Sequence, residues 1–414
     1  MNKNNVLNFY ENLLEHNFLP YWSKFVDDEY GGLLNCINNY GDKLICKDKF
    51  TWSQGRWLWC LGRIYALKQK GAFSSVSEEN LLKWMKGTYD FICNHSIYGD
   101  SICCFLLEQD GTKKLDARTK RYDASIYADS FALIGMSQYA KVLNLKEEFP
   151  KIEKLYNSIM KRIEENDFLT EPYPIPDGML THSITMIVIN SVSEYALMKR
   201  SLGLNCDNEI KTARKYIDFL MNDLYHEDGY ILEYIHADGS PLRNSILESH
   251  ATPGHMMESM WFAIDFLQEF GGLNEYLPKI AKTIKVAFNL GWDEKYGGIN
   301  RHVSINGGRP TGENMGNPIE NLVEDTWSMK LWWPQNETLY ALFKLYDLTG
   351  DEEFKTLYEK TFTYAFTVFP NHEIGEWEQI RKEDGTAEDK VVALPVKDPF
   401  HTLRCFIKIV ETCL

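Results

Sequence analysis

Asp28-Glu29-Tyr30-Gly31-Gly32-Leu33, a short turn near the N-terminus, returns late in the chain as Asp293-Glu294-Lys295-Tyr296-Gly297-Gly298-Ile299. Weaker copies of this turn place further glycines at positions 99, 178, 229 and 375, which makes six copies in all. The glycines of two neighbouring pairs, 31 to 99 and 229 to 297, are 68 residues apart. Recurrence at a fixed spacing is typical of folds built by repeating one supersecondary unit.

Helical patterns occupy the segments between these turns, with apolar residues recurring every three or four positions. The main patterns cover residues 57–67, 125–143, 185–198, 258–270, 337–348 and 403–413. A second amphipathic pattern accompanies most of them, at residues 81–92, 151–163, 208–220, 277–290 and 352–367. Two helices in each of six units give about twelve helices.

The sequence therefore predicts an all-α fold in which about twelve alternating buried and half-buried helices close into a double ring, an (α/α)6 barrel. Short extended segments after the turns, such as residues 298–303, are expected to pair as β-hairpins at one mouth of the barrel. No Pro/Ser-rich linker or low-complexity block interrupts the chain. Residues 1–414 are therefore expected to form a single domain.

The charge balance and the cysteines argue against several classes of protein. The chain has 59 acidic and 44 basic residues and a net charge of −15, whereas nucleic-acid binding needs clustered Lys and Arg. The nine cysteines are an odd number without a C-x-x-C pair, so neither a zinc site nor a disulfide framework is indicated. The N-terminus lacks the apolar segment of a signal peptide, and no stretch is apolar enough to span a membrane. We therefore expect a cytoplasmic protein with no nucleic-acid or membrane partner.

The aromatic content and the missing motifs narrow the function further. Aromatic residues make up 14% of the chain, which suits a thick helical core, a site where rings stack on sugar faces, or both. The sequence contains no phosphate-binding loop, dinucleotide fingerprint, H-E-x-x-H zinc motif or G-x-S-x-G nucleophile motif. Kinase, nicotinamide dehydrogenase, zinc hydrolase and serine hydrolase functions therefore lose their usual support.

Two histidines each stand three residues before a charged residue. His255 precedes Glu258, and His401 precedes Arg404. At helical pitch this spacing puts both side chains on the same face, one turn apart. An imidazole titrates near neutral pH, so two of them facing one pocket suit proton abstraction on one side and proton delivery on the other. This hypothesis requires a fold that brings the two histidines together.

Four short strings together resemble the N-acylglucosamine 2-epimerase family. They are Trp52-Ser53-Gln54-Gly55-Arg56, Pro253-Gly254-His255-Met256-Met257-Glu258, Met329-Lys330-Leu331-Trp332-Trp333-Pro334 followed by Glu337, and Phe400-His401-Thr402-Leu403-Arg404-Cys405. The match runs in order from about residue 20 to the C-terminus. Each string alone is weak evidence, and their combination is specific.

The resemblance implies an (α/α)6 barrel that inverts C2 of an open-chain sugar without a redox cofactor. It implies that His255 and His401 are the paired catalytic histidines, in an order that the sequence does not give. Arg56 and Arg404 would hold the oxygen that gains charge, and Glu258 would orient His255 or assist ring opening. The same strings supply the remaining expected sugar-binding residues, Gln54, Lys330, Trp332 and Trp52.

No cofactor and no metal is expected, because the site would be built from His and Arg, and activity should survive chelation. Some members of the family are activated by ATP, and the sequence leaves nucleotide activation open. It also leaves a homodimer open. The expected partner is a small-molecule sugar.

The identity of the sugar depends on a middle helix, residues 185–190. Family members that act on cellobiose or mannose carry a third histidine there, whereas this chain has Thr-Met-Ile-Val-Ile-Asn. This favours interconversion of N-acetylglucosamine and N-acetylmannosamine, with apolar residues beside the acetyl methyl. His182, one turn upstream, could enter the site after a register shift, so an epimerase or aldose-ketose isomerase acting on mannose, glucose or cellobiose is the alternative.

Two further functions share the predicted fold. An (α/α)6 glycoside hydrolase needs two carboxylates across the site, for which Asp129, Glu248 and Glu337 are available. A sugar-binding protein without turnover would be expected to have lost both histidines, and both are present. The Gly- and Asn-rich segment 306–325 is interpreted either as a solvated loop or as a lid over the barrel mouth.

Overall fold

Six helices form a closed inner ring in the computed structural model, which describes residues 2–414. Each inner helix packs against the next, and the last returns to the first. The inner helices are α3 (Thr51–Lys68), α5 (Ile126–Leu143), α7 (His182–Ser201), α10 (Pro253–Phe270), α13 (Trp332–Thr349) and α15 (Phe400–Cys413). This closure confirms the predicted (α/α)6 barrel.

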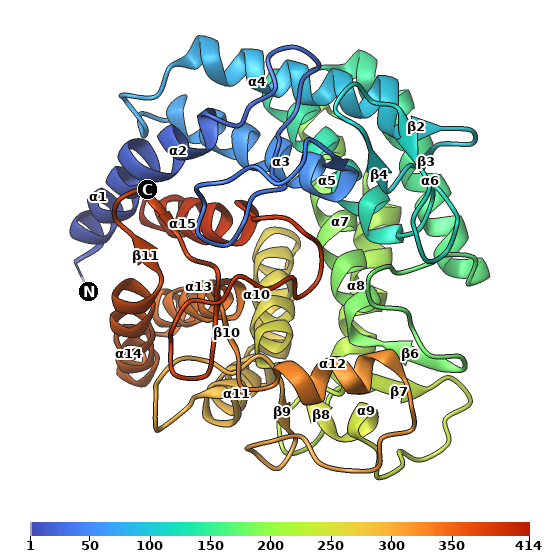
Figure 1. Ribbon diagram of the computed structural model, residues 1–414, viewed down its shortest axis with the longest axis vertical. Helices are drawn as coiled ribbons and strands as arrows, with labels where there is room; N and C mark the ends of the chain where they lie inside the picture. The colour runs from blue at the N-terminus through green and yellow to red at the C-terminus, as the bar shows by residue number, and fades with distance from the viewer. Residues whose placement is uncertain (1) are drawn as a thin grey trace.

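A second set of helices covers the ring from outside, each packed mainly on one inner helix. Figure 1 shows α4 and α14 at the rim, with α10 and α15 nearer the centre. The outer helices are α1 (Lys3–Leu13), α4 (Glu78–Phe91), α6 (Phe149–Glu165), α8 (Asp207–Asn222), α11 (Leu273–Gly291) and α14 (Glu352–Val368). A π-helical turn, Leu14–Phe18, joins α1 to α2 (Leu19–Ser23). Among residues 2–414, no helix combines the length and apolar character needed to cross a bilayer.

Most inner helices begin earlier than their apolar patterns predict. The pattern at 57–67 belongs to a helix that starts at Thr51, and the pattern at 258–270 belongs to one that starts at Pro253. The first turns lack the apolar repeat because several of their side chains face a cavity rather than the core. The quoted sequence strings lie in these turns. Because their side chains include polar residues that face the cavity, the apolar pattern did not reveal where the helices start.

Glycine allows α3 and α5 to approach closely. A Cβ atom added to Gly55 would lie 2.1 Å from the carbonyl oxygen of Phe131, and one added to Gly135 would lie 2.4 Å from that of Gly55. Neither position can therefore carry a side chain without moving a helix. The glycine of the Gln-Gly-Arg string is thus required for packing.

The repeated turns each contain a glycine in a conformation with positive φ. The six glycines at 31, 99, 178, 229, 297 and 375 all have positive φ, which favours glycine over other residues. In the two best copies an aspartate side chain accepts hydrogen bonds from the N–H groups two and three residues later, and these aspartates are Asp27 and Asp293. The structural repeat therefore aligns Asp27, rather than Asp28, with Asp293.

Short strands and small helices lie in the connections between the helices, and several strands immediately precede an inner helix. The strands are β1 (Lys49–Phe50), β2 (Ile97–Tyr98), β3 (Ile102–Cys103), β4 (Leu106–Leu107), β5 (Lys113–Lys114), β6 (Met179–Thr181), β7 (Tyr234–His236), β8 (His250–Ala251), β9 (Val303–Ser304), β10 (Lys330–Leu331), β11 (Pro370–Asn371), β12 (Glu376–Trp377) and β13 (Ile380–Arg381). The short helices are α9 (Ile246–Ser249), α12 (Pro318–Thr326) and a 3-10 turn at Lys146–Glu148.

Two kinds of strand pair occur. β2–β3, β4–β5 and β11–β12 are local hairpins, as predicted. β1–β4, β6–β7, β8–β9 and β10–β13 join segments far apart in the chain. The segment 298–303 makes both kinds of contact. Ile299 forms an isolated antiparallel bridge with Trp292 across the turn, as expected of a hairpin, and Val303 pairs with Ala251 of β8.

Candidate active site

A cavity of about 220 Å³ opens between the N-terminal ends of the inner helices. All six inner helices contribute side chains to its wall. Connecting segments add residues that include Tyr173, the α12 residues Ile319 and Leu322, and Val392 and Leu394. The segment 306–325 thus includes most of a helix that borders the cavity, so it is not entirely a solvated loop, and its function as a lid stays a prediction.

His255 lies on the cavity wall in the first turn of α10 and is held by a carboxylate. Its Nδ1 is 3.1 Å from Oε2 of Glu233, whose other oxygen is 3.4 Å from Nδ1 of His182. Burial alone lowers the pKa of His255, but the charge of Glu233 and the hydrogen bond to it raise the pKa above its usual value. Glu233 therefore extends the pH range over which His255 is protonated, and in that form Nε2 carries a hydrogen.

His401 lies on the same cavity in the first turn of α15 and has the opposite charge preference. Its Nδ1 is 2.6 Å from Oε1 of Glu337. Because a carboxylate accepts, Nδ1 carries the hydrogen and the lone pair lies on Nε2. Burial, together with the nearby positive charges of Arg56 and Arg404, lowers the pKa of His401 to about 3. His401 is therefore a neutral imidazole that can accept a proton.

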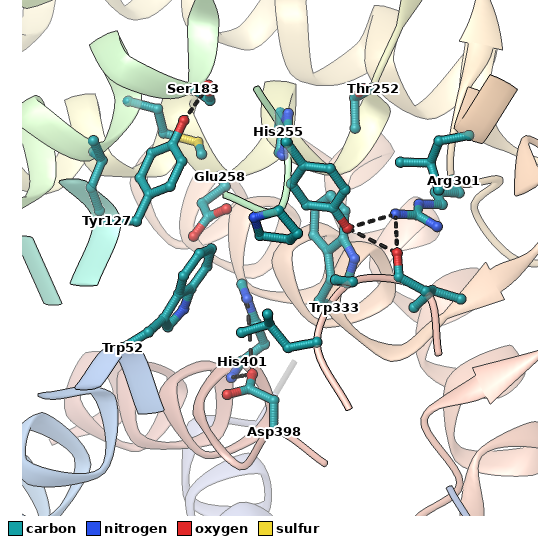
Figure 2. A pocket seen from close by; sticks show the side chains of 18 of the residues that line it. Trp52, Tyr127, Ser183, Thr252, His255, Glu258, Arg301, Trp333, Asp398 and His401 are labelled. Carbon is teal, nitrogen blue, oxygen red and sulfur yellow. Dashed lines mark hydrogen bonds and ion pairs between the residues drawn. The ribbon is translucent and has the colours of Figure 1, made fainter. Parts of the chain in front are cut away.

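Trp333 brings the two imidazoles into one site. Its ring centroid is 5.2 Å from that of His255 and 5.8 Å from that of His401. Figure 2 shows His255 and His401 on either side of the pocket centre, with Trp333 beside them. A Cβ atom on Gly254 would lie 2.3 Å from this indole, so the glycine before His255 makes room for it. One proton donor and one proton acceptor can thus face a single bound molecule.

Arg56 supplies a positive charge close to His401. Its guanidinium is 3.4 Å from Oδ1 of Asp398 and lies over the rings of Trp52, Phe131 and Phe400. The aromatic rings fix the plane of the guanidinium, and the carboxylate balances its charge. A cation held in this way can stabilise an oxygen that becomes negative during a reaction.

The structure brings six of the predicted site residues to the cavity wall. They are Trp52, Arg56, His255, Glu258, Trp332 and His401. Their roles remain predictions, with one change of partner. Glu258 bonds to Arg404, and it is Glu233 that holds His255.

Three other predicted residues do not reach the cavity wall. Gln54 bonds through its side-chain amide to the backbone N–H and C=O of Leu33. Lys330 donates to Asp293, Asn300 and the carbonyl of Ser328. Gln54 and Lys330 are therefore placed to support turns rather than to contact a sugar.

Arg404 is the third predicted residue away from the wall, buried below it. Its guanidinium bonds to the carboxylates of Glu258 and Glu337. Trp261 donates to the other oxygen of Glu337 over 2.7 Å. Arg404 therefore acts on His401 through Glu337 and through its charge, and it has no free path to a sugar oxygen.

Several residues of the site escaped the sequence analysis. Glu233, Asp398 and Arg301 line the cavity, and Glu337, which does not, was named in a family string but given a role only as a hydrolase carboxylate. Glu233 is 22 residues from His255, and Glu337 is 64 residues from His401. No helical spacing links such pairs. Glu337 stood in a recognised string, whereas nothing in the sequence distinguished Glu233 from other acidic residues.

The wall beside Tyr127 is apolar and belongs to α5 and α7. Met186 and Ile187 line it, close to Tyr127, whose hydroxyl bonds to Ser183 over 2.7 Å. His182 is fully buried and lies outside the lining, where Nδ1 faces Glu233. The register shift that would have brought His182 into the cavity does not occur.

Two trios of side chains could provide metal ligands, with ligand atoms within 4.8 Å of one another. The first is His182, Glu233 and His255, and the second is Glu258, Glu337 and His401. In the second trio Arg404 already bonds both carboxylates, so a cation there would compete with a guanidinium. In the first trio a metal would replace the hydrogen bonds that orient His255.

Comparison with known proteins identifies the family. The sequence profile of the N-acylglucosamine 2-epimerase (GlcNAc 2-epimerase) family matches residues 32–405. The chain is 25% identical to the N-acylglucosamine 2-epimerase of Mus musculus, over 92% of this chain and 85% of that protein. It is 23% identical to a cellobiose 2-epimerase of Ruminococcus albus, over 97% of each chain.

A solved structure agrees with the fold. The cellobiose 2-epimerase of Bacillus thermoamylovorans superposes with a TM-score of 0.77 and 18% sequence identity, over 99% of each chain. The fold, the sequence profile and the similar proteins therefore all indicate the same family. The chain belongs to the N-acylglucosamine 2-epimerase family and is a carbohydrate 2-epimerase, an enzyme of the isomerase class.

Proposed function

We propose that the protein interconverts N-acetyl-D-glucosamine and N-acetyl-D-mannosamine by removing and returning the proton on C2 of the open-chain sugar. The observation that carries this proposal is the pair of imidazoles in one cavity. The pKa of His401 is lowered to about 3, that of His255 is raised, and both imidazoles lie against Trp333. A reaction that takes a proton from one face and adds one to the other needs this combination.

The chemistry follows from these protonation states. Nε2 of His401 accepts the C2 proton, and the electron pair of the broken C–H bond moves into a C1–C2 double bond as O1 becomes negative. Arg56 stabilises this oxygen, because its guanidinium lies on the cavity wall and carries a positive charge close to His401. His255 then donates its Nε2 proton to the opposite face of C2. The reverse reaction uses the same groups in exchanged roles.

The N-acyl substrate is supported by the wall that Met186 and Ile187 form. An acetyl methyl can contact these side chains without leaving a polar group unpaired. His182, which could have supplied a third imidazole, lies behind Glu233. A neutral hexose or a disaccharide such as cellobiose is the second candidate, because relatives named for cellobiose cover 97% of the chain.

Hydrolysis is less well supported, because the candidate carboxylates are held as charge partners. Glu337 bonds to Arg404 and His401. Asp129 bonds to Arg162, and Glu248 lies beside His236, with neither on the cavity wall. A glycosidase needs one protonated and one free carboxylate at the scissile bond.

Incubation in deuterated water with N-acetylglucosamine, N-acetylmannosamine, mannose and cellobiose tests the proposal. We expect both N-acetyl sugars to gain deuterium at C2 and to convert into each other, as followed by proton NMR. The neutral sugars should react more slowly. Rapid exchange of mannose or cellobiose, with none in the N-acetyl sugars, would favour the second candidate. Release of monosaccharides from cellobiose without exchange would indicate a hydrolase.

A further inference from the structure

One corner of the cavity carries a positive charge that the proposed chemistry does not use. We name it the Arg301 corner, made of His250, Thr252, Arg301 and His302, all of which line the cavity. In Figure 2, Arg301 and Thr252 lie at the opposite side of the pocket from Trp52 and Tyr127. A ligand that spans the pocket would therefore meet apolar rings at one end and the Arg301 corner at the other.

Arg301 is a buried cation without a carboxylate partner. It is 4% exposed, and within residues 2–414 no ion pair involves it. Its guanidinium bonds only to neutral acceptors, which are the Thr326 hydroxyl, the Tyr173 hydroxyl and the carbonyl of Val392. Buried arginines are normally paired with an acid, because an uncompensated charge in a protein interior is costly.

The other charged groups of the cavity are already balanced. Arg56 faces Asp398, and Glu258 bonds to the buried Arg404. Glu233 is shared by two histidines. Arg301 is thus the one arginine or lysine on the described cavity wall with no acidic partner.

Hydrogen-bonding capacity is also left over in this corner. Arg301 uses three of its five N–H groups, and Nε is buried without a partner. Nε2 of His302 is likewise buried without a partner. Burial and the neighbouring Arg301 hold the pKa of His302 well below its usual value, so this imidazole is neutral and can donate or accept one further bond.

Helix α10 begins in the same corner. Thr252 is its N-cap residue, yet no side chain caps the first N–H groups. The Thr252 hydroxyl is instead 3.1 Å from Nδ1 of His302. An uncapped start of an 18-residue helix attracts negative charge. Three independent features, the unpaired guanidinium, the free imidazole nitrogen and the helix start, therefore favour an anion.

We propose that the Arg301 corner binds an anionic group, a phosphate or a carboxylate, carried by the sugar at the end remote from C2. This inference rests on the proposed function and narrows it, because the preferred substrate becomes an anionic N-acyl hexosamine. Thr252 and His255 are three residues apart, which corresponds to a rise of about 4.5 Å along a helix. That span is comparable with the distance from C2 to C6 of an extended hexose, so both ends of one sugar can be engaged.

Binding of reduced sugars tests the inference separately from catalysis. N-acetylglucosaminitol has no carbonyl group, so it cannot be deprotonated at C2 and reports binding alone. Calorimetry would compare it with its 6-phosphate and with the corresponding 6-carboxylate. We expect the better of the two anions to bind about tenfold more tightly or more, as charge-assisted hydrogen bonds provide. The two anionic ligands also show which group the corner accepts.

Three variants locate the effect. Arg301→Gln should remove the preference for the anion, and Arg301→Lys, which keeps the charge, should retain part of it. Arg381→Gln is the matched control, because Arg381 is also buried but pairs with Glu378 outside the cavity. It should leave the preference unchanged.

Equal binding of the neutral and anionic alditols by the wild-type protein would overturn the inference, even if no Arg301 variant folds. So would an anion preference that survives Arg301→Gln. A variant that weakens all three ligands equally and melts earlier would show that Arg301 only ties Tyr173 and Val392 together. Failure of the epimerase proposal has a different signature, which is anion preference without deuterium exchange in any sugar.

Discussion

His255 and His401 share one cavity, but their surroundings favour opposite protonation states. Glu233 raises the pKa of His255, whereas burial and two guanidinium groups lower the pKa of His401 to about 3. The two imidazoles therefore differ in proton affinity before the sugar binds. This difference gives one group suited to accept a proton and another suited to donate one, without any rearrangement of the enzyme.

The pH dependence of kcat/KM tests this difference in proton affinity between His255 and His401. The pKa of His255 is raised, so its proton is present at low pH and is lost as the pH rises through the raised value. His401, with a pKa of about 3, stays unprotonated throughout the mildly acidic range. We therefore expect kcat/KM to fall on the alkaline side, in both directions, because the equilibrium constant between epimers does not depend on pH.

Glu233→Gln should move this alkaline limb to lower pH, because it removes the charge that raises the pKa of His255. Glu248→Gln is a matched control, since Glu248 is also buried and lies 3.2 Å from a histidine, His236, that does not line the cavity. An alkaline limb unchanged in Glu233→Gln would show that another group sets it.

The sequence allowed the histidines to be predicted but not the carboxylates that tune them. His255 and His401 each lie in a string with helical spacing, so both could be named before the fold was known. Glu233 precedes β7, in a connection whose path depends on packing throughout the barrel. Its role therefore became visible only when three-dimensional contacts placed it beside His255.

At the scale of secondary-structure elements, two turns are built on the same plan. Lys49 donates to Asp27 over 2.7 Å, and Lys330 donates to Asp293 over 2.8 Å. Both lysine side chains are fully buried. Each lysine thus joins a glycine-bearing turn to the strand that precedes an inner helix.

Lys330→Met should destabilise the fold without changing the affinity for the sugar. The substitution leaves Asp293 without its buried partner, which typically costs about 3–5 kcal/mol of unfolding free energy. Urea denaturation would measure the loss, and KM should stay at the wild-type value because Lys330 lies off the cavity wall.

Lys360→Met is the control for this experiment. Lys360 pairs with Glu294 in the same turn, but both side chains are exposed, so little or no change is expected. A strongly raised KM in Lys330→Met with normal stability would restore the sequence-based prediction that Lys330 contacts the sugar.

Gln54 shows why membership of a family string does not establish that a residue contacts the sugar. Its side chain pairs with both backbone groups of Leu33, and Gln335 makes the same pair of bonds with Ile299. A residue of a family string can thus stabilise a turn rather than bind a ligand. The sequence contained both glutamines, but only the geometry showed that they are equivalent.

At the scale of the whole molecule, the barrel joins residues separated by more than 300 positions. Trp52 and His401 line one cavity because α15 returns to pack on α3. The six-fold repeat was sufficient to predict this closure. The segments near Tyr173, Ile319 and Val392 were not predictable in the same way, because they have no periodic pattern and are positioned by contacts such as those of Arg301.

The central claim is that His255 and His401 act on opposite faces of C2. Deuterium exchange by His255→Asn and His401→Asn, measured separately for each epimer, tests it most directly. Each variant keeps one base, which can remove a proton and return deuterium on its own face only. We therefore expect neither variant to epimerise, one variant to exchange C2 of one epimer, and the other variant to exchange C2 of the other epimer.

Circular dichroism and sugar binding would establish that both variants remain folded. We predict complementary exchange, with each variant active on one epimer alone. Exchange of both epimers by either variant, or epimerisation at the wild-type rate in either, would contradict it.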